Sequence, residues 1–148
     1  MPFKYKENVA IADVAFEATG KTLNELFEAC ALAATDVMVD PKTVSADAKK
    51  DIIMESEKLD NLLFDFLAEI IFLKDAEMLL FSKYYVKIEE KKNGSEGEIK
   101  YSLHCQALGE IINPEKHKLR ADVKAVTYHM FELKKAKTGW KAFIVLDI

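Results

Sequence analysis

The residues with the clearest chemical potential are two aspartates set in apolar stretches near opposite ends of the chain. Asp13 lies in the middle of an alternating hydrophobic segment, where a carboxylate is costly to bury unless it is paired or bound to a cation. Asp147 follows the apolar run Phe143-Ile144-Val145-Leu146 and precedes the final Ile148. Chain ends are usually polar and frayed, so this apolar run predicts a terminal strand that docks on the rest of the protein.

If the first and last strands are neighbours, three anionic groups converge: the side chains of Asp13 and Asp147 and the α-carboxylate of Ile148. Like charges that close cannot all stay ionised without a cation. Oxygen ligands favour Ca²⁺ or Mg²⁺, and Mn²⁺ also accepts them. This pattern predicts a divalent metal site. The plainer alternative is that Asp13 is a strand-edge or turn residue and Asp147 a solvated terminal charge, and spacing leaves both open.

A second candidate region is the segment 122–129. Strand alternation places Lys124 on one face with Val126, Tyr128 and Met130, and places His129 on the opposite face. Lys124 follows a long polar loop, so it either extends to solvent at a strand end or points into a shared site. The simpler expectation for His129 is a hydrogen-bonded histidine in the core.

Other common chemical patterns are absent from the sequence. The five glycines are scattered, so no phosphate-binding loop is present, and no Ser or Cys lies in a nucleophile elbow. Cys30 and Cys105 stand outside any metal or disulfide pattern, which fits a reducing compartment. No signal peptide and no apolar stretch of about 20 residues is found, so we expect a cytoplasmic protein without a membrane partner. The net charge of -4 argues against direct nucleic-acid binding.

The elements that position these residues are predicted in the order β-α-β-α-β-β-β-β. The first helix has a capping box at Thr22 and Glu25 and should end near Met38, and the second helix is capped by Ser56. Strands are expected over 5–18, 43–55, 81–90, 99–108, 122–134 and 140–148. This order predicts one α+β domain over residues 1–148, with two helices packed on a mostly antiparallel sheet.

Several of these motifs, taken in order, resemble the archease family. The run Val123 to His129, together with the Leu146-Asp147-Ile148 terminus, is the most specific part. The other matching motifs are Ala12-Asp13, Gly20-Lys21-Thr22-Leu23, Leu26-Phe27-Glu28-Ala29, Leu62-Leu63 to Leu67, Gly109-Glu110 and His117.

What the resemblance implies is a non-catalytic activator of the RtcB-type tRNA-splicing ligase. Such activators promote guanylylation of the ligase and multiple turnover, and they broaden its nucleotide use. The resemblance also implies a metal site at Asp13, Asp147 and Ile148, with calcium as the first expectation, and a functional lysine at Lys124. One departure is Ala10, because many family members carry a histidine at that position.

Two alternative functions and one property stay open from the sequence. The family has also been viewed as a chaperone-like modulator of proteins that process DNA or RNA. A small metal-dependent hydrolase would use the same two carboxylates, although no general base stands at a readable spacing from them. The oligomeric state is not determined by the sequence.

Overall fold

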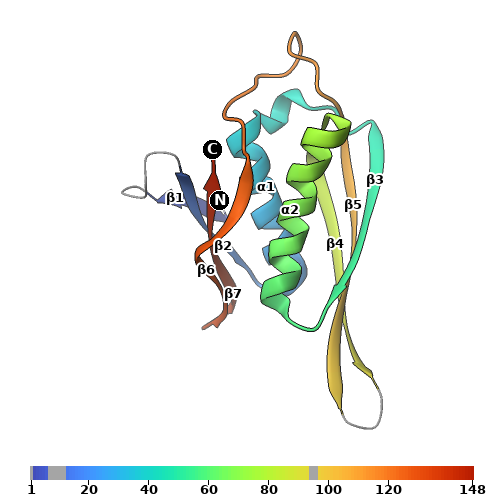
Figure 1. The fold of residues 1–148 in the computed structure, drawn as a ribbon, viewed down its shortest axis with the longest axis vertical. Coiled ribbons are helices and arrows are strands. Elements are labelled where there is room, and N and C mark those ends of the chain that lie inside the picture. Colours follow the sequence, from blue (N-terminus) through green and yellow to red (C-terminus); the bar gives the residue numbers. More distant parts are fainter. Residues whose placement is uncertain (1, 7–12, 94–96) are drawn as a thin grey trace.

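Two antiparallel sheets enclose two helices in the computed structural model, which describes residues 2–6, 13–93 and 97–148 (Figure 1). One sheet has the strand order β1-β2-β7-β6 and the other the order β3-β5-β4. The elements are β1 (Phe3–Lys6), β2 (Asp13–Gly20), α1 (Leu23–Met38), the 3₁₀ turn η1 (Pro41–Thr43), β3 (Ala48–Ser56), α2 (Leu59–Glu77), β4 (Leu79–Asn93), β5 (Glu98–Ile111), β6 (Ala125–Ala136) and β7 (Gly139–Asp147).

The predicted α+β class is confirmed, with two sheets where one was expected. The single strand predicted over 5–18 is wrong. Residues Phe3–Lys6 form a separate strand that folds back on β2, with Phe3 opposite Ala18 and Lys6 opposite Ala15. Alternation is present in both paired segments, so periodicity could not separate one long strand from two strands that pair with each other.

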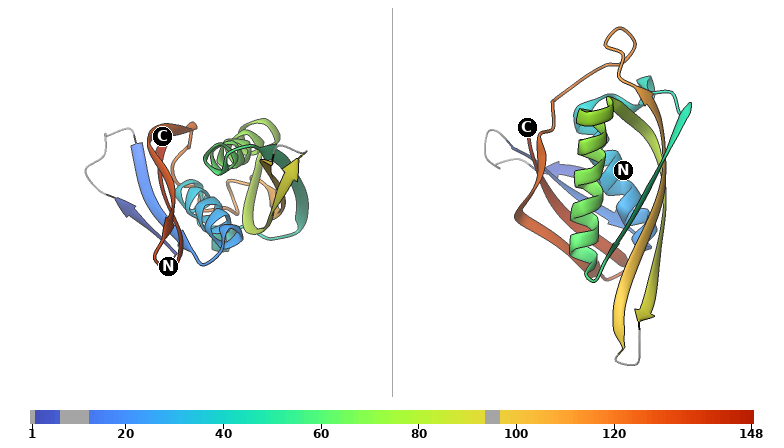
Figure 2. Two further views of the ribbon diagram at one scale, coloured as in Figure 1. Left: turned by 90° about the horizontal axis from the view of Figure 1, so that it is seen from below. Right: turned by 45° about the vertical axis from the view of Figure 1, so that its right-hand side comes forward.

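Helix α1 begins and ends where its local signals predict. The Thr22 hydroxyl accepts a hydrogen bond from the Glu25 backbone N–H at 3.2 Å, and the Glu25 carboxylate accepts one from the Lys21 N–H at 2.9 Å. The helix ends at Met38, before the Asp40-Pro41 turn. Its small buried side chains let both sheets approach it closely; they are Ala29, Cys30, Ala31, Ala33 and Ala34. Figure 2 shows both helices lying between the two sheets.

Helix α2 begins later than its predicted cap. Ser56 ends β3, and its hydroxyl accepts a hydrogen bond from the Lys58 N–H at 3.3 Å. The N-cap residue is Lys58, which makes no side-chain capping hydrogen bond. The strand predicted over 43–55 likewise starts later, at Ala48, because η1 precedes it. In the core, Phe66 of α2 stacks on Phe27 of α1 with ring centroids 6.0 Å apart. No helix of the described part of the chain is long and apolar enough to cross a bilayer.

Side chains of α1 cover the outer edge of β4. The Asn24 amide oxygen accepts a hydrogen bond from the Ile88 N–H, and the Glu28 carboxylate accepts one from the Val86 N–H, each at 2.9 Å. Backbone groups on an uncovered edge strand would be free to pair with another chain. The helix therefore closes an edge that would otherwise favour association.

Candidate functional site

Strands β2 and β7 are paired, and Asp13 lies directly opposite Asp147. The next pairs along the same strands, Val14 with Leu146 and Phe16 with Ile144, turn inward to the core. Because side chains alternate along a strand, Asp13 and Asp147 share the outer face of this sheet, away from the helices. The predicted carboxylate cluster required the strand that carries Asp13 to lie next to the last strand. The structure meets this condition through β2, which is the second strand of the chain, and β7.

The segment that carries Lys124 meets the same sheet edge. Ala125 lies opposite Asp147 on its other side, and the Lys124 backbone N–H donates a hydrogen bond to the Asp147 carbonyl oxygen at 2.8 Å. Lys124 also lines an open pocket of about 280 Å³ on the side of α2. The backbones of Asp13, Asp147 and Lys124 are therefore neighbours across the sheet. The two carboxylates lie on its outer face, whereas the Lys124 side chain lines the pocket on the helix side.

Asp13 and Asp147 are directly opposite residues on one face of the sheet, and carboxylate oxygens are the ligands that a hard divalent cation prefers. Like charges directly opposite each other in a sheet are destabilising, and a cation removes that repulsion. Across the described ranges, no three His, Cys, Asp or Glu side chains gather closely enough to hold a metal ion. The side chains thus contribute two carboxylates, and the predicted third ligand is the α-carboxylate of Ile148. Ala10, where the family often has histidine, lies outside the described residues.

Lys74 fixes the chain just before Lys124, and sequence reasoning missed it. It is a buried lysine whose ammonium donates to Asp122 Oδ1 and to the Val123 carbonyl oxygen, both at 2.6 Å. It also lies 2.9 Å from Asp75 Oδ1, and its contact lowers the pKa of Asp122. A signal was present, because position 74 is four residues after Ile70 on the buried face of α2.

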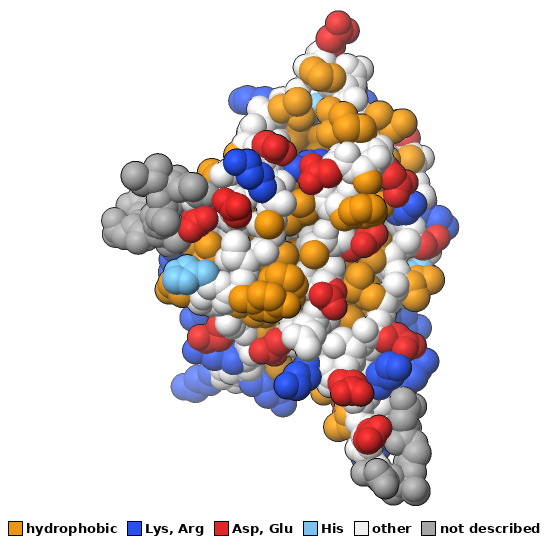
Figure 3. Space-filling view, in the orientation of Figure 1, with side chains coloured by type: hydrophobic (Ala, Val, Ile, Leu, Met, Phe, Trp, Pro, Cys, Tyr) orange, Lys and Arg blue, Asp and Glu red, His pale blue; other side chains and the backbone are white. Residues whose placement is uncertain are grey.

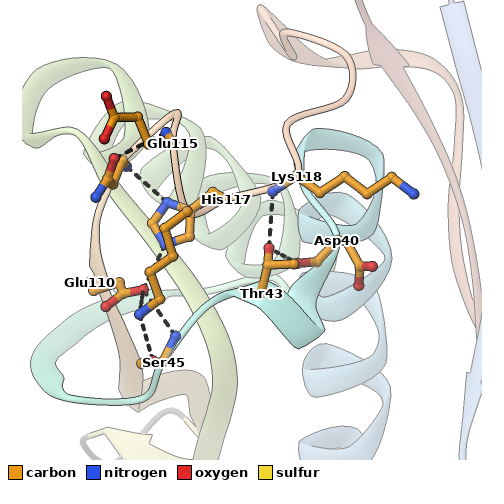
Figure 4. A network of polar contacts seen from close by, with 9 residues as sticks. Asp40, Thr43, Ser45, Glu110, Glu115, His117 and Lys118 are labelled. Carbon is orange, nitrogen blue, oxygen red and sulfur yellow. Dashed lines mark hydrogen bonds and ion pairs between the residues drawn. The ribbon is translucent and has the colours of Figure 1, made fainter.

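The loop between β5 and β6 is held by a polar network around Glu110 and His117 (Figure 4). The Asn113 N–H donates to His117 Nδ1 at 2.9 Å, so the other ring nitrogen carries the proton and donates to Glu110 Oε1 at 2.6 Å. Lys116 Nζ lies 2.7 Å from the same carboxylate oxygen, and the Ser45 N–H donates to it at 3.1 Å. Hydrogen bonds from these three groups lower the pKa of Glu110 to about 2.

A second set of contacts holds the same loop beside η1. The Lys118 N–H donates to the Thr43 hydroxyl at 3.1 Å, and that hydroxyl donates to the Asp40 carbonyl oxygen at 2.7 Å (Figure 4). The Asp40 N–H in turn donates to the Lys118 carbonyl oxygen at 2.9 Å. The loop that leads into Lys124 is therefore held by contacts with β5, with η1 and the residue Asp40 before it, and with Ser45 between η1 and β3. At its end, the Lys124 N–H is hydrogen-bonded to β7.

The expected placement of His129 in the core is wrong, because His129 is exposed. Thr127 pairs with Val145 and Glu132 with Phe143, so the four residues 128–131 stand opposite the single residue Ile144. Such a bulge interrupts the alternation on which the prediction relied. Met130 inside it adopts a positive φ of 56°.

The two cysteines do not add a nucleophile to the site. Both Cys30 and Cys105 are buried free thiols. Burial raises the pKa of each thiol, that of Cys105 to about 12, so the reactive thiolate is suppressed.

Comparisons with known proteins give one consistent result. The profile of the archease protein family matches residues 3–148. A protein archease of Methanosarcina mazei is 39% identical over 145 residues, which is 98% of this chain and 96% of that protein. One of Thermococcus kodakarensis is 40% identical over 98% of this chain and 99% of its own length. The solution structure of Methanobacterium thermoautotrophicum protein 1598 superimposes with a TM-score of 0.79, at 33% identity and 99% coverage of both chains.

Proposed function

This chain belongs to the archease family, and we propose that it is a non-catalytic activator of an RtcB-type tRNA-splicing ligase in the cytoplasm. In this role it promotes guanylylation of the ligase and its repeated turnover, and it alters the nucleotide specificity of the ligase. The ligase itself catalyses the joining reaction. The observation that carries the proposal is the direct pairing of Asp13 with Asp147 beside the backbone of Lys124. These are the residues that the family resemblance implies.

The proposed division of labour follows from the chemistry of the three residues. Asp13, Asp147 and the α-carboxylate of Ile148 would hold a divalent cation, with calcium as the first candidate and magnesium or manganese as alternatives. The bound ion would present positive charge to phosphate oxygens. Lys124 carries a compact ammonium on a flexible stem, which suits it to steady a phosphate group.

A turnover assay with RNA in excess over the ligase tests the proposal. Asp13→Asn and Asp147→Asn remove charge at nearly constant size, and Lys124→Ala removes the ammonium. Each should reduce stimulation by about tenfold or more, the scale on which loss of one essential charged contact acts. Glu90→Gln and Lys87→Ala, exposed on β4 of the other sheet, serve as matched controls that should stimulate like wild type. Full stimulation by all three site variants would refute the proposal.

A further inference from the structure

The outward face of α2 is strongly acidic. The helix contains a single basic residue, Lys74, and that residue is buried. Asp60, Asp65 and Asp75 are exposed on it. Its full set of acidic residues is Asp60, Asp65, Glu69, Asp75 and Glu77. Asp75 is paired with Lys74 at 2.9 Å and Glu77 with Lys50 at 3.1 Å. Among the described residues, the uncompensated negative charge on this face therefore comes from Asp60 and Asp65, with Glu69 partly buried beside them.

Aromatic side chains form an apolar patch on the same side of the molecule. Tyr128 of β6 lies flat on Phe64 of α2, with ring centroids 3.8 Å apart and planes inclined by 2°, yet Tyr128 remains 68% exposed. Phe131 packs edge-on against both rings, and Phe72 is 56% exposed. We name Phe64, Phe72, Tyr128 and Phe131 the α2–β6 patch. Figure 3, which views this side, shows hydrophobic side chains over α2 and β6 with acidic ones among them.

The patch is continuous with the candidate site. Phe64 and Phe72 line the open pocket that Lys124 also lines, together with Ala125. Tyr128 lies in the bulge of residues 128–131 and stacks on Phe64. The same bulge places Met130 in the left-handed region of backbone conformation, which is strained for a residue other than glycine. A molecule seated on the patch would thus lie next to Lys124.

The charge around the patch decides what kind of molecule can cover it. Phosphate-bearing ligands, such as an RNA backbone or an anionic lipid surface, would be repelled by the acidic face. A second copy of this chain on the same face would bring acidic residues against acidic residues. A protein surface that presents an apolar side chain flanked by Lys or Arg fits both the rings and the charge.

We propose that the α2–β6 patch is the docking surface for a basic surface of the protein partner. This proposal rests on the proposed function, in which the partner is the ligase. A ligase that acts on RNA is expected to present Lys and Arg side chains that contact phosphates, and such a basic surface would complement the acidic residues around the patch. The patch supplies affinity, and Asp13, Asp147 and Lys124 supply activation. The two roles are therefore separable by substitution.

The test measures ligase turnover as the concentration of this protein is increased. Phe72→Ala and Tyr128→Ala remove rings, and Asp65→Lys reverses a charge. Each should raise the concentration for half-maximal stimulation by about tenfold, the usual effect of a strong interface residue, with the maximal stimulation unchanged. Tyr85→Ala on β4, which truncates a tyrosine that is 55% exposed, and Glu90→Lys are the matched controls and should behave like wild type. Circular dichroism confirms that each variant is folded.

Direct binding to the purified ligase by calorimetry separates the possible failures. Wild type that stimulates, with patch variants indistinguishable from the controls, overturns the docking surface and leaves the proposed function intact. Wild type that binds without stimulating overturns the proposed function, and weaker binding by the patch variants would still support the surface. Wild type that does not bind overturns both. A dimer or single-stranded RNA binding that is lost in Tyr128→Ala would overturn the chosen occupant.

Discussion

Asp13 and Asp147 are direct partners across the β2–β7 pair, so the two ends of the chain place two carboxylates on one outer face of the sheet. Two like charges opposite each other cost stability in the protein alone. A site that binds a cation gains from the same arrangement. In the proposed function, the pairing that lowers the stability of the metal-free protein is therefore the same pairing that would hold the cation.

Asp13→Asn should stabilise the metal-free protein, because it removes this repulsion at constant shape. We expect the free energy of unfolding in chelator to rise by about 0.2–1 kcal/mol. Wild type should gain about 2.7 kcal/mol at a calcium concentration 100-fold above its Kd, and the variant should gain far less. Urea denaturation with chelator or calcium measures both, with Glu90→Gln as control. A variant that loses stability in chelator, or that responds to calcium like wild type, would contradict the proposed site.

Lys74→Met should loosen the chain that leads into Lys124. The substitution leaves the buried Val123 carbonyl oxygen and the Asp122 carboxylate without their donor, and we expect a loss of about 1–3 kcal/mol in urea denaturation. Asp122→Asn is the milder counterpart, because that side chain is largely exposed, and should cost under about 1 kcal/mol. Hydrogen exchange at the Lys124 amide, which donates to Asp147, should quicken in Lys74→Met. Unchanged exchange would show that Lys74 does not position this segment.

Glu110 should make stability depend on pH under acidic conditions. Its pKa in the folded protein is about 2, below the roughly 4.3 of an unfolded chain. The stabilisation it provides is thus complete above about pH 5 and declines as the pH falls toward about 2. Glu110→Gln cannot titrate, so its free energy of unfolding should fall less steeply over that range. Equal slopes for the two proteins in denaturation series at successive pH values would rule this out.

Removing the cover of β4 should favour association. The double variant Asn24→Ala with Glu28→Ala leaves the N–H groups of Ile88 and Val86 without partners. We expect a loss of about 1–3 kcal/mol in stability and larger species that increase with concentration in sedimentation velocity. Glu90→Ala, exposed on the same strand, should stay unchanged. A double variant that sediments like wild type would show that other features protect this edge.

The candidate site could be predicted only in part. Asp13, Asp147 and Lys124 stood out as charged residues in apolar or strand-forming surroundings, which is a local property of the sequence. Lys74 escaped notice because a lysine on a helix usually reaches solvent, and only the fold reveals that this one is buried against Val123. His129 was misplaced because the bulge in β6 breaks the alternation that periodicity assumes.

The sequence by itself determined the elements whose signals are local. Helix α1 runs from its Thr22 cap to Met38 as predicted, because capping and the buried stripe depend on residues three or four apart. Tertiary structure decided the return of β1 onto β2, the partnership of Asp13 with Asp147, and the stacking of Tyr128 on Phe64. These contacts join segments distant in the sequence, so they depend on how the two sheets pack around the helices, which no local pattern encodes.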